Sequence, residues 1–293
     1  MDKIKVKVPA TSANLGSGFD CVGIAYELYN VFEFEKIDTG LEILGCEPEY
    51  ATSENLAYVA YKRVCEKIGV DPSVRIKILE INVPNSRGLG SSATFICAGA
   101  YAAYRLHENT LSHEDVLEIC TEIEGHPDNI APALYGSLCS AVMEKEFTKA
   151  VKFPVSEKIH FTVLVPDFQV KTEDARHQLP ELVDRGDAVY NMSRVALLPY
   201  AFENGDFDLL RIVTKDRIHQ KYRKKLFKNI DEIKTAAYGC GAKSFVISGA
   251  GSTCLCMSDK PIANELNEII KNMPNGWVAT ELKISREGTE EVL

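Results

Sequence analysis

The sequence predicts an α+β protein built from two packed halves. At 293 residues the chain is longer than a typical single domain and shorter than three. Segments in which apolar and polar residues alternate, as in strands, are interleaved with segments that carry apolar residues at helical spacing. These signals do not follow the strict strand–helix–strand order of a doubly wound sheet, which favours the α+β class.

The individual elements follow from these periodicities and from the residues at their ends. Alternation predicts strands at residues 5–9, 29–37, 74–83, 137–142, 160–165, 244–248, 253–257 and 277–284. Helical spacing predicts helices at 55–68, 92–106, 112–125, 187–203, 207–213, 229–238 and 262–272. Residues 10–23 are small and polar and are expected to form a loop. A change of domain is expected near 145–158, with an N-terminal ATP-binding domain at 1–152 and a C-terminal domain at 153–293.

Composition and charge restrict the class of protein. Hydrophobic residues make up 45% of the chain and charged residues 26%, as in a globular enzyme. The net charge of -9 argues against a nucleic-acid partner, which needs a basic face. The nine cysteines lack the spacing of a zinc site or a disulfide framework. Neither a signal peptide nor a spanning helix is indicated, so we expect a protein of the cytoplasm with no membrane partner.

The most informative segment joins the strand at 74–83 to the helix at 92–106. Its residues are Pro84, Asn85, Ser86, Arg87, Gly88, Leu89, Gly90, Ser91, Ser92, Ala93 and Thr94. Glycines allow a tight turn, and the helix start that follows exposes unpaired N–H groups that attract phosphate oxygens. The Lys-Ser/Thr pair of a Walker A loop is missing. The segment is therefore predicted to bind the phosphates of a nucleotide.

This segment resembles the phosphate-binding motif of the GHMP kinases, and two further segments are similar to other motifs of that family. Residues 9–20 resemble its first motif and residues 248–253 its third, although Ser252 stands where proline is common. The resemblance implies a ribosomal-protein-like α+β domain followed by a ferredoxin-like α+β domain. It also implies that Gly249, Ala250 and Gly251 approach ATP from the second domain.

Within the family, the strings at 11–20, 122–133 and 170–180 resemble those of the homoserine kinases. The resemblance implies ATP-dependent phosphorylation of the L-homoserine hydroxyl, a step of threonine biosynthesis, by a homodimer. Homoserine is a zwitterion, so its ammonium needs oxygen acceptors and its carboxylate an arginine fork. The implied substrate-binding residues are Asn14, Asp20, His126, Asn129, Thr172, Arg176 and Arg223. Arg217, close to Arg223, is an alternative for the second arginine.

The implied catalytic residues are Asp20, Asn14, His126 and Asn129. Asp20 is either a general base or a group that only orients the substrate, because loose phosphoryl transfer asks little of a base. Mg²⁺ is expected at Ser92, or alternatively Ser91, together with Glu122 or Glu124, and the sequence leaves the choice between the two glutamates open. Asn and Asp in a turn-rich segment also commonly cap their own backbone, which is the structural alternative for Asn14 and Asp20.

Two other functions fit the same residues less well. The chain could be another GHMP kinase of the mevalonate, shikimate or diphosphocytidyl-methylerythritol type, whose substrates lack the zwitterion. It could also be a ligand-sensing homologue without turnover, although the serines, glutamates and Asp20 expected for chemistry are all present.

Overall fold

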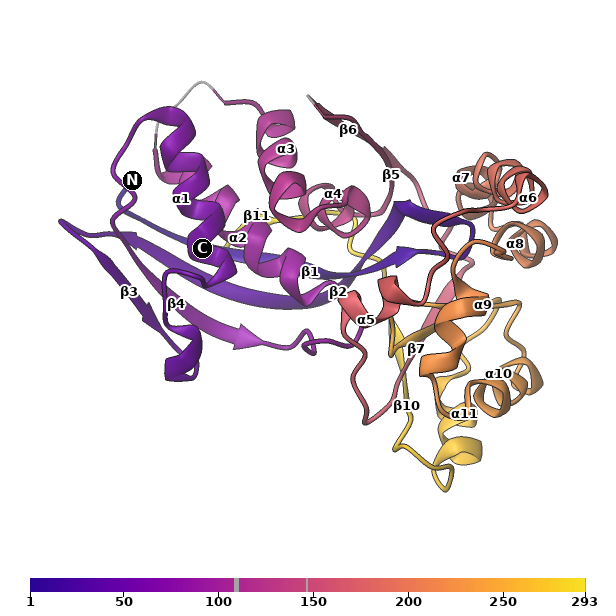
Figure 1. Cartoon of the computed structure of the whole chain (residues 1–293). Helices are drawn as coiled ribbons and strands as arrows, with labels where there is room; N and C mark the ends of the chain where they lie inside the picture. Colours follow the sequence, from indigo (N-terminus) through magenta and orange to yellow (C-terminus); the bar gives the residue numbers. More distant parts are fainter. Residues whose placement is uncertain (108–110, 146, 293) are drawn as a thin grey trace.

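The structure is a computed structural model that describes residues 1–107, 111–145 and 147–292. It contains two sheets with helices packed against them, in agreement with the predicted α+β class (Figure 1). The strands of the first sheet are β1 (Lys3–Asn14), β2 (Gly18–Lys36), β3 (Leu41–Leu44), β4 (Val74–Ile81), β5 (Leu138–Met143), β6 (Thr148–Phe153) and β11 (Glu290–Glu291). Their order is β11–β1–β2–β4–β3, and β5 pairs with both β2 and β6.

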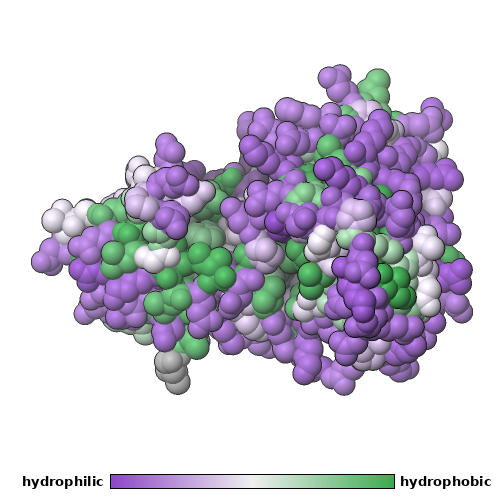
Figure 2. Space-filling model, turned by 90° about the horizontal axis from the view of Figure 1, so that it is seen from below, coloured by the Kyte–Doolittle hydropathy of each residue, from purple (hydrophilic) through white to green (hydrophobic). Residues whose placement is uncertain are grey.

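Helices cover one face of the first sheet (Figure 1). They are α1 (Leu56–Ile68), α2 (Ser91–Leu106), α3 (His113–Glu124) and α4 (Pro127–Tyr135), and a short 3-10 helix lies at Pro48–Tyr50. The core between sheet and helices includes Ile4, Val6, Phe32, Phe34, Ile76, Val64, Ile96 and Ile119. Helices α1 and α2 approach closely at Gly99, where an added Cβ would lie 1.9 Å from the carbonyl oxygen of Ala57. The opposite face of the sheet, seen in Figure 2, shows green apolar side chains among purple hydrophilic ones.

The second sheet is buried on both faces. Its strands β7 (His160–Val165), β8 (Ser244–Ile247), β9 (Cys254–Ser258) and β10 (Val278–Leu282) lie in the order β10–β7–β9–β8. One face packs on α7 (Leu198–Asn204) and α8 (Phe207–Val213), the other on α10 (Ile230–Gly239) and α11 (Ala263–Ile270). The remaining elements are α5 (Thr172–His177), α6 (Arg185–Val195), α9 (Gln220–Arg223) and a 3-10 helix at Lys224–Leu226.

The prediction of a loop at residues 10–23 is wrong. Strand β1 continues to Asn14 and β2 begins at Gly18, and the two pair antiparallel almost to the turn between them. Residues 10–18 are buried, so this hairpin end lies inside the protein. Small side chains allow that close packing, and they also hide the alternation by which a half-exposed strand is recognised.

The single helix expected at 187–203 is two helices, α6 and α7. Helix α7 begins at Leu198, with Pro199 in its first turn. Proline is compatible with the first turn of a helix but not with its interior, because it lacks an N–H donor and its ring clashes with the preceding turn. By contrast, the helix expected from Ser112 is confirmed: Ser112 and Asp115 form a capping box at the start of α3.

The predicted domain boundary between residues 152 and 153 falls at the end of β6 and stays a prediction. The last strand, β11, pairs antiparallel with β1, so the chain returns to the first sheet after completing the second. In the described ranges, none of the helices has both the length and the apolar character needed to cross a membrane.

Candidate active site

Most of the predicted site residues line one cavity, although they come from distant parts of the sequence. Those at its wall are Asn14, Asp20, Asn85, Ser86, Gly88, Gly90, Ser91, Ser92, Glu124, His126, Asn129, Thr172, Arg176, Arg223, Gly249 and Ala250. Ala13 and Asp128, which were not predicted, also line it. The cavity is thus formed by the β1–β2 hairpin, the segment before α2, the α3–α4 junction, α5, α9 and the turn between β8 and β9.

The segment before α2 has the geometry expected of a phosphate loop. Gly90 is the N-cap of α2 and adopts a left-handed conformation with φ of 71°. An added Cβ at Gly90 would lie 2.0 Å from the hydroxyl oxygen of Thr11, so only glycine fits there. Helix α2 begins at Ser91, and its first N–H groups are available to an anion.

Several residues of this segment have structural contacts instead of reaching the cavity. Leu89 and Ala93 are buried in the apolar cores. The hydroxyl of Thr94 donates to the Ser91 carbonyl at 2.7 Å, and Asn30 donates to that hydroxyl at 2.8 Å. Pro84, Arg87 and Gly251 are also outside the cavity lining. The sequence could not separate these residues from those that line the cavity, because both kinds occur in the segment before α2 and, for Gly251, in the glycine-rich turn between β8 and β9.

The structure distinguishes the two glutamates expected at the metal. Glu124 ends α3 and lines the cavity, where the Ser92 hydroxyl donates to its Oε1 at 2.6 Å. Burial raises the pKa of Glu124 above 4.5, although the Ser92 hydrogen bond and the charge of His126 oppose the shift. Glu122 is not brought to the cavity: its side chain is 48% exposed and lies 3.3 Å from Arg63. The two differ because residues two apart on a helix project in different directions.

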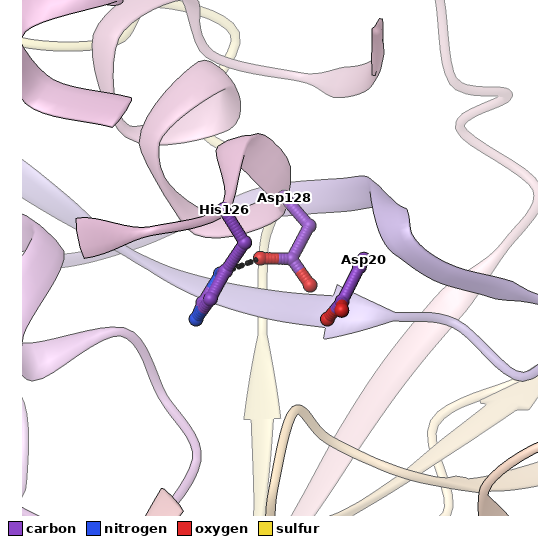
Figure 3. Close-up of side chains that lie close together, drawn as sticks. All are labelled: Asp20, His126 and Asp128. Carbon is purple, nitrogen blue, oxygen red and sulfur yellow. Dashed lines mark hydrogen bonds and ion pairs between the residues drawn. The ribbon is translucent and has the colours of Figure 1, made fainter. Parts of the chain in front are cut away.

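His126 and Asp128 form a hydrogen-bonded pair next to Asp20 (Figure 3). His126 is the N-cap of α4, and its Nδ1 lies 2.5 Å from Oδ1 of Asp128, whose side chain is only 2% exposed. Burial alone would lower the pKa of His126, but the hydrogen bond and charge of Asp128, with the charges of Glu124 and Asp20, raise it above 6.5. The signal for Asp128 was present in the sequence, two residues after His126 in the string at 122–133.

Asp20 is held from two sides. Its carboxylate oxygens accept from both terminal nitrogens of Arg176, each at 2.9 Å. Its backbone N–H donates to the Asn14 side chain at 3.0 Å, and the Asn14 amide donates in turn to the Gly249 carbonyl at 3.0 Å. Both Asn14 and Asp20 have positive φ, 72° and 58°. Left-handed backbone at a non-glycine residue is often found where function fixes a side chain.

Arg223 lies at the cavity with a guanidinium that is not fully paired. The residue is 2% exposed, its Nη1 donates to the Gly249 carbonyl at 2.7 Å, and its buried Nε has no partner among the described residues. Its guanidinium lies 5.2 Å from the Phe19 ring, and the His219 ring stacks on the same phenylalanine. Arg217, the alternative, does not line the cavity: its side chain is 52% exposed and lies 3.5 Å from Asp187.

The remaining predicted residues complete the wall. Asn129, on α4, accepts from the Thr11 hydroxyl at 2.8 Å, which ties it to β1. Thr172 begins α5, the same short helix that carries Arg176. The site therefore combines a helix N-terminus and a buried carboxylate with two arginines facing an aspartate, an arrangement that can hold phosphate groups beside a small zwitterion.

Comparison with known proteins agrees with this geometry. The model of the GHMP kinases N-terminal domain matches residues 55–137, and that of the GHMP kinases C-terminal domain matches residues 198–275. A homoserine kinase of Clostridium botulinum is 41% identical over 290 residues, covering 98% of this chain and 97% of that protein. One of Caldicellulosiruptor saccharolyticus is 44% identical over 261 residues, covering 88% of this chain and 84% of that protein.

Solved structures show the same fold. The crystal structure of a homoserine kinase from Cytophaga hutchinsonii has a TM-score of 0.89 and 28% sequence identity, covering 100% of this chain and 98% of that one. A mevalonate diphosphate decarboxylase from Staphylococcus aureus has a TM-score of 0.75 at 15% identity, with coverage of 100% and 98%, and shares the fold. The phosphate loop, the two family models and the relatives that match nearly the full length all indicate the same family. The chain therefore belongs to the GHMP kinases, and within them to the homoserine kinase family.

Proposed function

We propose that the protein transfers the γ-phosphoryl group of ATP to the hydroxyl of L-homoserine, giving O-phosphohomoserine and ADP, as a step of threonine biosynthesis. The observation that carries the proposal is the placement of Asp20, Arg176 and Arg223 in the cavity that also contains the N-terminus of α2. The names of the relatives at 41% and 44% identity support the same substrate.

A zwitterionic substrate would satisfy the charged groups of the cavity together. Its carboxylate would take the place of the Asp20 carboxylate on Arg176 and reach the unpaired Nε of Arg223. Its ammonium would then pair with the Asp20 carboxylate, which no longer contacts Arg176 and lies beside the Asn14 side chain. An uncharged acceptor such as a sugar could not replace the ion pair, since it would leave both charges of this half-exposed pair without partners.

ATP would place its phosphates against the backbone of Ser86–Gly90 and the first turn of α2, where N–H groups and the helix dipole favour anions. The homoserine oxygen attacks the γ-phosphorus, the bond from phosphorus to the ADP oxygen breaks, and the hydroxyl proton passes to solvent water. Asp20 orients the substrate in this scheme. The bidentate contact with Arg176 supports that role, because in it the Asp20 carboxylate already pairs with a cationic group.

The residues at the phosphate loop fit a magnesium ion. Mg²⁺ prefers oxygen ligands, and the Ser92 hydroxyl and the Glu124 carboxylate supply two beside the phosphate loop. Bound there, Mg²⁺ would neutralise charge on the transferred phosphoryl group. Asp20, His126 and Asp128 also offer ligand atoms within 4.8 Å of one another. In that cluster, however, Asp128 already contacts Nδ1 of His126, and Arg176 occupies both oxygens of Asp20.

Release of ADP, measured with Mg-ATP and a panel of acceptors, tests the proposal. The panel contains L-homoserine, D-homoserine, L-threonine, mevalonate, shikimate and galactose. Turnover with L-homoserine well above all other acceptors is expected. Turnover with another acceptor would support the assignment of the phosphate loop but reject L-homoserine as the substrate. Binding of L-homoserine or ATP without release of ADP would indicate a ligand-sensing protein.

A homodimer, which the family resemblance implies, is part of the proposal. Leu44 on β3 and Leu79 on β4 are 48% and 43% exposed. They alternate with Ile43 and Ile78, which face the helix-covered core, so they lie on the uncovered face of the first sheet shown in Figure 2. Exposed apolar surface of this kind is often covered by a partner subunit. Light scattering after size exclusion should give twice the mass of the chain, and a monomer mass would reject the dimer.

A further inference from the structure

Arg87 lies in the predicted phosphate loop, yet its side chain contacts the other half of the protein. Its Nη1 donates to the carbonyls of Pro166 and Phe168, the latter at 2.9 Å, and its Nη2 donates to the Asp167 carbonyl at 2.9 Å. One guanidinium thus holds three consecutive carbonyls. The planar fork of arginine suits such a set of acceptors, whereas the ammonium of lysine is a point charge on a flexible stem.

The backbone around Arg87 is joined to the second half at further points. The Ser248 hydroxyl donates to the Gly88 carbonyl at 2.6 Å, and the Thr253 N–H donates to the Arg87 carbonyl at 2.9 Å. Val170 contacts the Ser86 carbonyl through its N–H at 3.4 Å. The loop therefore lies fixed between the β8–β9 turn and the segment after β7.

The carbonyls that Arg87 holds belong to the segment that leads to the substrate site. Residues 166–171 connect β7 to α5, which carries Thr172 and Arg176. Within this connection the Phe168 carbonyl also accepts from the Ser252 hydroxyl at 2.6 Å. Val170 and Ala175 pack on Ala250, beside the turn that faces the phosphate loop. The position of α5 is thus set from the phosphate loop on one side and from the β8–β9 turn on the other.

We infer that Arg87 is a positioning residue for substrate binding and not a ligand of the ATP phosphates. It holds residues 166–168 in place, so that α5 presents Thr172 and Arg176 to the cavity in the orientation needed for the substrate carboxylate. The inference deepens the proposed function and rests on it for the identity of the substrate. Its structural part is that hydrogen bonds from Arg87 fix residues 166–168 and thereby α5, and this part does not depend on which substrate binds.

The expected kinetic signature separates the two roles of an arginine in a phosphate loop. In Arg87→Gln and Arg87→Lys, KM for L-homoserine should rise about 10- to 150-fold, as for the loss of charge-assisted hydrogen bonds, while the Kd of ATP changes by less than about 2-fold. A phosphate ligand would give the opposite pattern, with weakened ATP binding in Arg87→Gln and largely retained binding in Arg87→Lys. Arg75→Gln is the matched control, since Arg75 pairs with Glu35 and Glu42 on the first sheet away from this contact.

Hydrogen exchange tests the same inference without a substrate. Amides of residues 166–176 should exchange faster in Arg87→Gln than in the unmodified protein, with the rest of the protein unchanged. Ser252→Ala removes another donor to the Phe168 carbonyl and should raise KM for homoserine in the same direction, with a smaller effect. This variant leaves the phosphate loop sequence intact.

The outcomes are separable from those of the proposed function. Absence of homoserine turnover in the unmodified protein would reject the proposed function, and the exchange data would still decide whether Arg87 holds the connection. Unchanged exchange at 166–176 in both Arg87 variants would overturn the inference. A rise in the Kd of ATP with unchanged KM for homoserine would also overturn it, and so would a kinetic effect no larger than that of Arg75→Gln.

Discussion

Both carboxylate oxygens of Asp20 lie 2.9 Å from the terminal guanidinium nitrogens of Arg176, so each group is the ion-pair partner of the other. A substrate that carries both charges can exchange into this pair without leaving either charge unpaired. In the proposed function the pair would favour zwitterions, because any other acceptor that displaced it would leave a charge without a partner.

Asp20→Asn should raise KM for L-homoserine about 10- to 150-fold, as expected for the loss of a charge-assisted hydrogen bond, with a limited change in kcat. Steady-state kinetics at saturating ATP measure the split. If kcat falls instead while KM stays near that of the unmodified protein, Asp20 is the general base and the orienting role is wrong.

Arg223→Lys should raise KM for L-homoserine about 10- to 100-fold, because lysine cannot reproduce the contact of the buried fork. The preference for homoserine over an amino alcohol that lacks the carboxylate should shrink in the variant. Arg217→Lys is the control, since Arg217 is exposed and outside the cavity lining. Equal effects of the two substitutions would show that Arg223 does not contact the carboxylate.

Glu124→Gln should lower kcat by about 100-fold or more, the usual loss when an electrostatic contact to the reacting group is removed. A higher Mg²⁺ concentration should be needed for half-maximal rate. Glu122→Gln, two residues away on the same helix and exposed, should behave like the unmodified protein. A loss of activity in the Glu122 variant alone would show that Glu122, and not Glu124, is the metal ligand.

Asp128→Asn should destabilise the protein more in mild acid than in base. The pKa of His126 is raised in the folded state, so its contact with Asp128 adds stability below about pH 6.5 and loses it as pH rises through the folded pKa. Chemical denaturation at about pH 6 and about pH 9 measures the difference. In a His126→Gln background the effect of Asp128→Asn on stability should no longer depend on pH. If the pH dependence persists, a titrating group other than His126 causes it.

Gly99→Ala should lower the free energy of unfolding by about 1–3 kcal/mol, because the new methyl group meets the backbone of α1. Gly239→Ala is matched to it in kind: Gly239 also lies in a helix, but an added Cβ there meets nothing within 4 Å. This control should be neutral or slightly stabilising, by up to about 1 kcal/mol. Similar losses for both would mean that the contact of α1 with α2 is not as close as described.

Local chemistry made much of the site predictable from sequence. The phosphate loop has a residue pattern that few other turns share, and the strings around Asp20, His126 and Arg176 resemble those of the homoserine kinases. The sequence could not show which side chains face the cavity. Arg87 illustrates this limit, because its direction depends on carbonyls about eighty residues away, at 166–168.

The fold was predicted best where elements are amphipathic. Helix α1 and the capped start of α3 follow from periodicity and end signals. The hairpin end at residues 10–18 was missed because it is buried, so no alternation marks it. Strand β11 is two residues long and is defined only by its pairing with β1, a contact that no local pattern encodes.

That pairing has a consequence for the order of assembly during synthesis. The ribosome releases β1 long before β11, so the backbone of Val6 and Lys7 meets its partners Glu291 and Glu290 only late in synthesis. Until then the edge of the first sheet stays open, and open strand edges pair readily with other chains. The β1 edge of the nascent protein is therefore open to pairing with other chains until β11 emerges, and a chaperone that shields β1 would protect it during that interval.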